Sequence, residues 1–185
     1  MDYITNLRKY VGHDTLISLG ATTLVFNDNK ELLLNLRTDT KTWGIPGGSM
    51  ELYETIEETA IRELKEETNI NAERLELVTI LSGNDYYFEY PNGDKICTVI
   101  ALFKVLNYNG EIKVSDNESK ELKFFSLTNL PILESRAKAI IDKILDGTIK
   151  ITGICLIWTL FFCQVQLKRQ LLNNCLFISS IIFSD

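Results

Sequence analysis

Residues 47–70 read GGSMELYETIEETAIRELKEETNI, a glycine pair followed by a segment crowded with carboxylates. We expect residues 55–68 to be helical, which places Glu63 three residues from Glu66 and four from Glu67 on one face. Like charges at these spacings destabilise a helix by roughly 0.2–0.5 kcal/mol per pair. Hard divalent ions such as Mg²⁺ bind to carboxylates and phosphates together, so the acidic face predicts a cation site.

The two ends of this segment carry signals for the backbone. Gly47 and Gly48 permit a ligand or another backbone to approach closely. Asn69 stands where the helix must stop, and after Gly it is the residue that best adopts the left-handed conformation of a helix end. The buried stripe is expected to consist of the apolar side chains Ile56, Ala60, Ile61 and Leu64.

Around the segment, the chain alternates β-rich and helical stretches. Residues 16–26 are nearly all apolar, which predicts a strand buried on both faces, and residues 31–37 are expected to return as its hairpin partner. Further strands are predicted over 75–82, 86–90, 95–105 and 118–126. Helices are predicted over 2–10 and 135–145, with Gly12 and Gly147 as stop signals.

Charge and composition limit the function classes. The net charge is −6, and an acidic chain binds nucleic acid poorly, because neutralising phosphates requires clustered Lys and Arg. Four cysteines without a close pair predict reduced thiols rather than a zinc site. The N-terminus lacks an apolar secretory signal, so we expect a cytoplasmic location. The single histidine, His13, predicts a turn or packing role.

The composition changes after Lys150. We expect residues 1–150 to form one domain, and residues 151–185 are an apolar tail of separate character. Three interpretations compete for the tail: a membrane contact through 151–184, packing within the fold or a dimer interface, and extra residues not selected for this domain. Each uncharged run is shorter than the ~20 residues of a membrane span, which makes the membrane contact the least favoured.

The spacing of fixed residues resembles the Nudix box, G-x₅-E-x₇-R-E-U-x-E-E-x-G-U with U aliphatic. Gly48, Glu54 and the run from Arg62 to Ile70 occupy its positions, and only Asn69 departs from it, replacing Gly. The preceding Trp43-Gly44-Ile45-Pro46 is similar to the usual lead-in of this MutT-like family. The resemblance implies an α/β fold, an α/β/α sandwich around a mixed β-sheet. It further implies hydrolysis of a nucleoside diphosphate linked to another moiety, with Mg²⁺ or Mn²⁺ as cofactor.

Carried over by position, the resemblance assigns roles to individual residues. The expected metal ligands are Glu63 and Glu67, joined by Glu66, Glu54 and the Gly47 carbonyl. Arg62 is expected to hold the box carboxylates in place. A general base is expected among Glu63, Glu66 and an acid outside the box, for which Glu118 and Glu121 are the candidates, and the sequence does not choose between them.

The substrate is predicted to be a small nucleotide: a nucleoside triphosphate, ADP-ribose or a sugar nucleotide. Trp43 and Tyr87 offer aromatic surfaces for a base, Arg37 offers a cation for a phosphate, and Gly48 allows close approach. We expect no stable nucleic acid complex, and the sequence leaves a homodimer open. The alternative from another class is a Nudix module that senses a nucleotide without cleaving it.

Overall fold

A computed structural model of the chain describes residues 3–152. The chain divides into two units, residues 1–141 and residues 142–185, and the eight strands of the described residues all lie in the first. The tail from residue 153, about which three interpretations compete, lies outside the described residues. The predicted domain boundary at residue 150 therefore stays a prediction.

The larger sheet has the order β4-β1-β7-β5, built from Gly47–Ser49, Leu16–Leu24, Lys95–Asn109 and Asn71–Leu81, with β6 (Tyr87–Glu89) also paired to β7. β1 and β7 run parallel, from Leu16 beside Ile96 to Leu24 beside Lys104, whereas the other pairs are antiparallel. The sheet is therefore mixed, as predicted. β7 extends to Asn109, beyond the end of the strand predicted over 95–105.

The smaller sheet has the order β3-β2-β8, built from Trp43–Gly44, Leu32–Arg37 and Ser119–Phe125. The predicted hairpin between residues 16–26 and 31–37 is wrong, because β2 belongs to this second sheet. Both edges of β1 are occupied, one by β4 and the other by β7, so β2 has no edge to join. Only a single bridge between Phe26 and Leu32 links the two segments.

The prediction that residues 16–26 are buried on both faces is also wrong for the first half of β1. Ile17 is 79% exposed and Leu19 49% exposed, whereas Leu24 and Val25 are fully buried. The cause lies in the helix α2 (Ile56–Thr68), which packs on the sheet near Ala21 and leaves the start of β1 uncovered.

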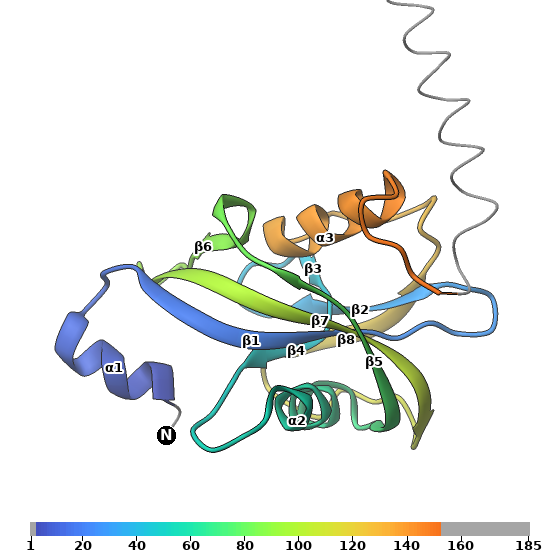
Figure 1. Ribbon diagram of the computed structural model, residues 1–185, viewed down its shortest axis with the longest axis horizontal. Coiled ribbons are helices and arrows are strands. Elements are labelled where there is room, and N and C mark those ends of the chain that lie inside the picture. Colours follow the sequence, from blue (N-terminus) through green and yellow to red (C-terminus); the bar gives the residue numbers. More distant parts are fainter. Residues whose placement is uncertain (1–2, 153–185) are drawn as a thin grey trace, which may run out of the picture. The chain divides into compact units, whose positions relative to one another are not determined.

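The part of the chain that the structure describes has three α-helices beside the sheets. Besides α2, they are α1 (Tyr3–Val11) and α3 (Ser135–Leu145), and a 3-10 turn, η1, spans Asn84–Tyr86. In Figure 1, α2 and the first turns of α3 lie on opposite sides of the larger sheet, while α1 lies at the end where β1 begins. This arrangement confirms the predicted α/β/α organisation. Among residues 3–152, no helix is long and apolar enough to cross a membrane.

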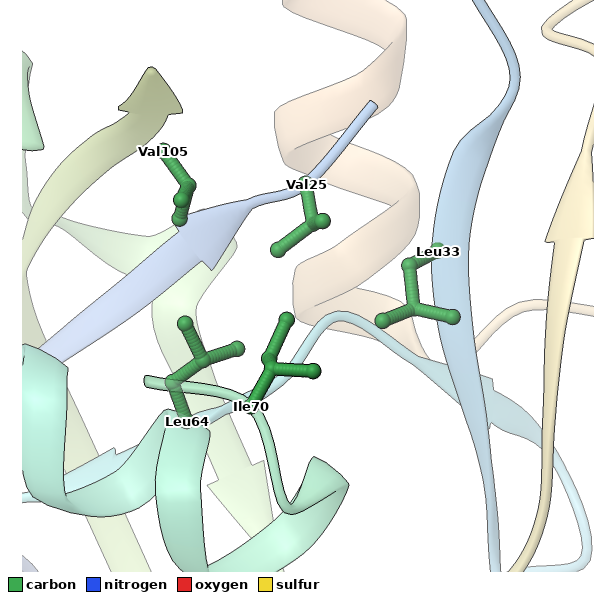
Figure 2. Close-up of a cluster of buried hydrophobic side chains, with 5 residues drawn as sticks. All are labelled: Val25, Leu33, Leu64, Ile70 and Val105. Carbon is green, nitrogen blue, oxygen red and sulfur yellow. The ribbon is translucent and has the colours of Figure 1, made fainter. Parts of the chain in front are cut away.

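One buried cluster connects both sheets to α2. Figure 2 shows Val25, Leu33, Leu64, Ile70 and Val105 converging, and each of them is at most 6% exposed. Leu33 comes from the smaller sheet and Val105 from the larger one, while Leu64 comes from α2. The acidic helix is therefore fixed to both sheets by apolar packing, which holds its carboxylates at a defined place between them.

Candidate active site

The ends of α2 are fixed by local hydrogen bonds. The Thr55 hydroxyl accepts from the Glu58 amide, and the Glu58 carboxylate accepts from the Thr55 amide, which forms a capping box. At the other end Asn69 has φ 62°, and its amide donates to the Lys65 carbonyl. The predicted left-handed Asn69 is confirmed, so the departure from the family pattern leaves the helix end intact.

The buried stripe of α2 differs in one residue from the prediction. Ala60 and Leu64 are buried, but Ile61 is 38% exposed, and Glu67 is buried in the position that continues the stripe. Residues 60, 64 and 67 share one side of a helix, because seven residues make nearly two turns. A carboxylate therefore faces the protein interior.

Arg62 is the centre of the carboxylate cluster. Its Nε donates to Glu54 Oε1 at 2.6 Å, Nη2 donates to Glu54 Oε2 at 3.0 Å, and Nη1 donates to Glu63 at 2.8 Å and to Glu66 at 3.3 Å. Nη2 also donates to the Ser49 carbonyl at 2.9 Å. The guanidinium thereby joins the helix to the end of β4. Its hydrogen bonds to Glu54 lower the pKa of that carboxyl to about 2.

Glu67 is 6% exposed and accepts hydrogen bonds from neutral donors, the Gly47 amide at 2.9 Å and the Asn35 side-chain amide at 3.3 Å. Burial raises the pKa of Glu67 well above its ordinary value, and the nearby charges of Glu63 and Asp116 add to the rise. The hydrogen bonds to Glu67 therefore come from neutral donors, and the charge of Arg37 only partly opposes the rise in its pKa.

Glu63 lies against the backbone of Gly48. Burial raises the pKa of Glu63, although its bond to Arg62 opposes the rise. A Cβ atom built on Gly48 would lie 2.5 Å from both carboxylate oxygens of Glu63, closer than such atoms can approach. A larger residue at this position would therefore displace the Glu63 carboxylate from the space that it fills.

We expect Gly48→Ala to displace the Glu63 carboxylate and to lower kcat by about tenfold or more, since a misplacement of about 1 Å can cost on the order of 100-fold. Steady-state kinetics on the best substrate would measure the loss. Ser82→Ala is the control, because Ser82 is exposed and is not part of the cavity lining. An unchanged kcat for Gly48→Ala would show that the position of Glu63 does not matter to turnover.

A cavity of about 630 Å³ extends from this cluster between the two sheets. Of the residues predicted from the sequence, the structure brings eight to its lining: Arg37, Gly47, Gly48, Arg62, Glu63, Glu66, Glu67 and Glu118. Burial favours a lower pKa for Arg37, but its hydrogen bonds to Asp39, together with the charges of Asp39 and other nearby acidic groups, raise that pKa above its ordinary value. Arg37 is thus a permanent cation in the cavity wall.

Four predicted residues are not part of the lining. Trp43 packs edge-on against Phe125, with ring centroids 4.7 Å apart, and the Tyr87 hydroxyl donates to Glu89. Glu121 is exposed on β8, and Glu54 forms an ion pair with Arg62 outside the cavity lining. In this structure, no aromatic surface from Trp43 or Tyr87 meets the cavity.

The cavity also contains residues that the sequence did not single out. Asp116 lies two residues before Glu118, and its charge contributes to the raised pKa of Glu67. A polar loop before a strand gave no signal that set Asp116 apart. The far wall is formed by Arg8, Tyr90, Asn92, Asp94, Glu134 and Arg136, which come from distant parts of the chain. Only the folded chain brings them together.

The donor atoms of the cluster suit a hard divalent cation. Within residues 3–152, no three Asp, Glu, His or Cys side chains converge as a complete metal site. Mg²⁺ usually needs only one or two protein carboxylates and completes its coordination with water and substrate phosphate. Glu67 is buried and accepts hydrogen bonds from neutral donors, and Glu63 and Glu66 lie on the same face of the helix, so a cation would find three carboxylates here.

Comparisons with known proteins agree with this geometry. A model of the NUDIX domain matches residues 17–146. An ADP-ribose pyrophosphatase of Methanocaldococcus jannaschii is 36% identical over 112 residues, which cover 60% of this chain and 62% of that protein. The chain thus spans less than two thirds of the length of that relative.

Two solved structures show the same fold. A MutT NUDIX hydrolase from Burkholderia pseudomallei superposes with a TM-score of 0.58 at 24% identity, covering 70% of this chain and 98% of the other. A MutT protein from Methanosarcina mazei Go1 gives a TM-score of 0.59 at 20% identity, covering 74% and 99%. At these identities the likeness shows the fold, and the residues must be interpreted from their own contacts.

Proposed function

We propose that this chain, which belongs to the Nudix family, is a divalent-metal-dependent pyrophosphohydrolase. Its substrate would be a small nucleoside diphosphate derivative. The observation that carries the proposal is the clamp of Arg62 on Glu54, Glu63 and Glu66, beside the buried Glu67, at one end of a cavity large enough for a nucleotide. A solvated acidic face would need neither the clamp nor the buried carboxylate.

The residues of the cavity would have separate roles in the reaction. Glu67 and Glu63, with Glu66, would hold Mg²⁺ or Mn²⁺, and the Gly47 carbonyl is a further candidate ligand. When bound, such an ion neutralises charge on a diphosphate and makes a coordinated water more acidic. Arg62 keeps the carboxylates in place, and Arg37 offers a permanent positive charge to a phosphate. Glu66 and Glu118 present exposed carboxylates that can accept a proton.

The candidate substrates are small nucleotides, whose size suits the cavity. ADP-ribose is the first candidate, since the relative from Methanocaldococcus jannaschii carries that activity in its name. Nucleoside triphosphates and sugar nucleotides are the other candidates. A diphosphate is anionic, so an acidic site can hold it only with a cation between them. We expect the protein to act in the cytoplasm without a stable nucleic acid partner.

A panel of ADP-ribose, the nucleoside triphosphates and common sugar nucleotides tests the proposal with purified full-length protein. We expect one class to be hydrolysed with Mg²⁺ or Mn²⁺ and none after chelation with EDTA, because the carboxylates alone repel the diphosphate. Phosphate detection after phosphatase treatment measures the products. Tight binding of a nucleotide with no product under either metal would support the sensing module instead.

A further inference from the structure

The helix α1 precedes the matched domain, residues 17–146, and yet forms part of the cavity wall. It has no buried residue, so apolar packing into a core does not hold it in place. Nevertheless Ile4, Thr5 and Arg8 all line the cavity. Figure 1 shows α1 at the end of the larger sheet where β1 begins. Polar contacts must therefore account for its position.

Arg8 provides most of the contacts that fix α1. Its Nη1 donates to the carbonyls of Gly12 at 3.1 Å and Asp14 at 2.5 Å, and its Nη2 donates to the Lys95 carbonyl at 2.6 Å. Its Nε lies 3.5 Å from Asp94 Oδ1. The side chain is only 11% exposed. One guanidinium thus joins α1 to the first residue of β7 and closes this end of the cavity.

The charges at this end are balanced. Arg8 lies beside Asp94, and Arg136 Nε bonds Glu134 at 2.7 Å. The remaining wall here includes the apolar side chains Ile4, Ile96, Ile100, Ala137 and Ile140. Elsewhere the lining carries the acids Glu63, Glu66, Glu67, Asp116 and Glu118. An end with balanced charges and apolar walls suits an uncharged group, whereas the acidic end suits a cation with a diphosphate.

One buried hydroxyl of the cavity wall has no hydrogen-bond partner. Within residues 3–152, Thr98 Oγ1 is buried without a hydrogen bond, whereas the buried Arg8 Nε, also without one, lies beside its ion-pair partner Asp94. A buried polar atom without a hydrogen bond destabilises the folded state. A ligand that presents both hydrogen-bonding and apolar surface would complete this wall, and a nucleobase with its ribose has both.

We propose that α1 and the start of β7, joined through Arg8, form the end of the cavity that receives the uncharged nucleoside of the substrate. The inference rests on the proposed function for the location of the diphosphate, at the box acids. It makes Arg8 a specificity-determining residue, which fixes the wall against which the nucleoside packs. A residue outside the matched domain would then decide which nucleotides the protein accepts.

Calorimetric titration tests the inference on the full-length chain, without turnover. The probes are the four common nucleoside monophosphates and ribose 5-phosphate, which lacks a base. We expect the wild type to bind one nucleoside monophosphate more tightly than ribose 5-phosphate. Arg8→Gln should weaken that binding by about tenfold, the size expected when a charged hydrogen-bonding group is lost, and leave ribose 5-phosphate within about twofold.

Lys9→Gln is the matched control, since it removes the same charge from the exposed side of α1 and should change neither affinity. Asp94→Asn is a second variant at the same contact, expected to weaken the same nucleotide if Arg8→Gln lowers the Tm too far. Equal weakening of both probes, or no weakening in either variant, would overturn the inference. So would a wild type that binds ribose 5-phosphate as tightly. A panel without hydrolysis would overturn the proposed activity alone.

Discussion

Glu67→Gln is expected to lower kcat/KM on the best substrate of the panel by about 100-fold or more, because the variant loses the buried negative charge that would hold the cation. The amide occupies the same volume, so the fold should stay intact. Steady-state kinetics at saturating Mg²⁺ would measure the loss. Glu57→Gln is the matched control: it removes one carboxylate from the exposed first turn of the same helix and should leave kcat/KM within about twofold.

The same substitution should raise the Tm of protein stripped of divalent ions. The pKa of Glu67 is raised in the folded state, so its contribution to stability is present below the ordinary value of 4.5 and is lost as pH rises through the folded pKa. At neutral pH the variant removes the destabilisation that comes from a buried carboxyl whose pKa is raised. Its higher Tm relative to the wild type should therefore disappear as the pH falls below 4.5. Full activity in a well-folded Glu67→Gln would contradict its assigned role.

Arg62→Ala is expected to lower the free energy of unfolding by about 2–4 kcal/mol, because it leaves clustered carboxylates without their cation. The variant loses hydrogen bonds to Glu54, Glu63, Glu66 and the Ser49 carbonyl together. Activity should fall as well, since Glu63 loses the contact that orients it. Urea unfolding and kinetics measure the two effects, with Arg74→Ala on the exposed surface of β5 as the control.

Arg62→Lys separates charge from geometry. A lysine keeps one positive charge but has no planar fork, so it cannot reach Glu54 with two nitrogens and bind Glu63 at the same time. We expect it to recover less than half of the lost stability. If Arg62→Lys behaved like the wild type, the clamp would be a matter of net charge alone, and the geometric account of Arg62 would be wrong.

The helix and its acids were predictable because their signals are local. The spacing of Glu63, Glu66 and Glu67 depends only on helical periodicity, and Asn69 depends only on the conformation that its own residue type permits. The resemblance to the Nudix box added Arg62, and the structure places its guanidinium among the carboxylates as that pattern implies. The fold class followed from the same stretch.

The pairing of the strands was not predictable in this way. β1 and β7 are separated by more than seventy residues in sequence, and nothing within residues 16–26 indicates that β4 and β7 occupy both of its edges. A turn cluster after a strand normally predicts a hairpin. Here the chain leaves the sheet after Val25 and begins a second one. The wrong expectation for Ile17 has the same origin, since its exposure depends on where α2 packs.

The cavity was predictable only at its acidic end. Arg37 and Glu118 lie where the sequence suggested, but Trp43 packs on Phe125 instead of lining the cavity. Arg8 and Asp94 are more than eighty residues apart in sequence and meet only through the folded chain. Sequence patterns describe single elements well, whereas the rest of the cavity wall is assembled from several.

Product analysis of one reaction tests the central claim most directly. Purified full-length protein is incubated with ADP-ribose and the other nucleotides of the panel in Mg²⁺, and the products are identified by mass spectrometry. The account predicts that one substrate yields two phosphorylated halves, split between its phosphorus atoms, and that EDTA stops their formation. Recovery of every nucleotide intact, with one of them tightly bound, would contradict it and identify the chain as a nucleotide-sensing module.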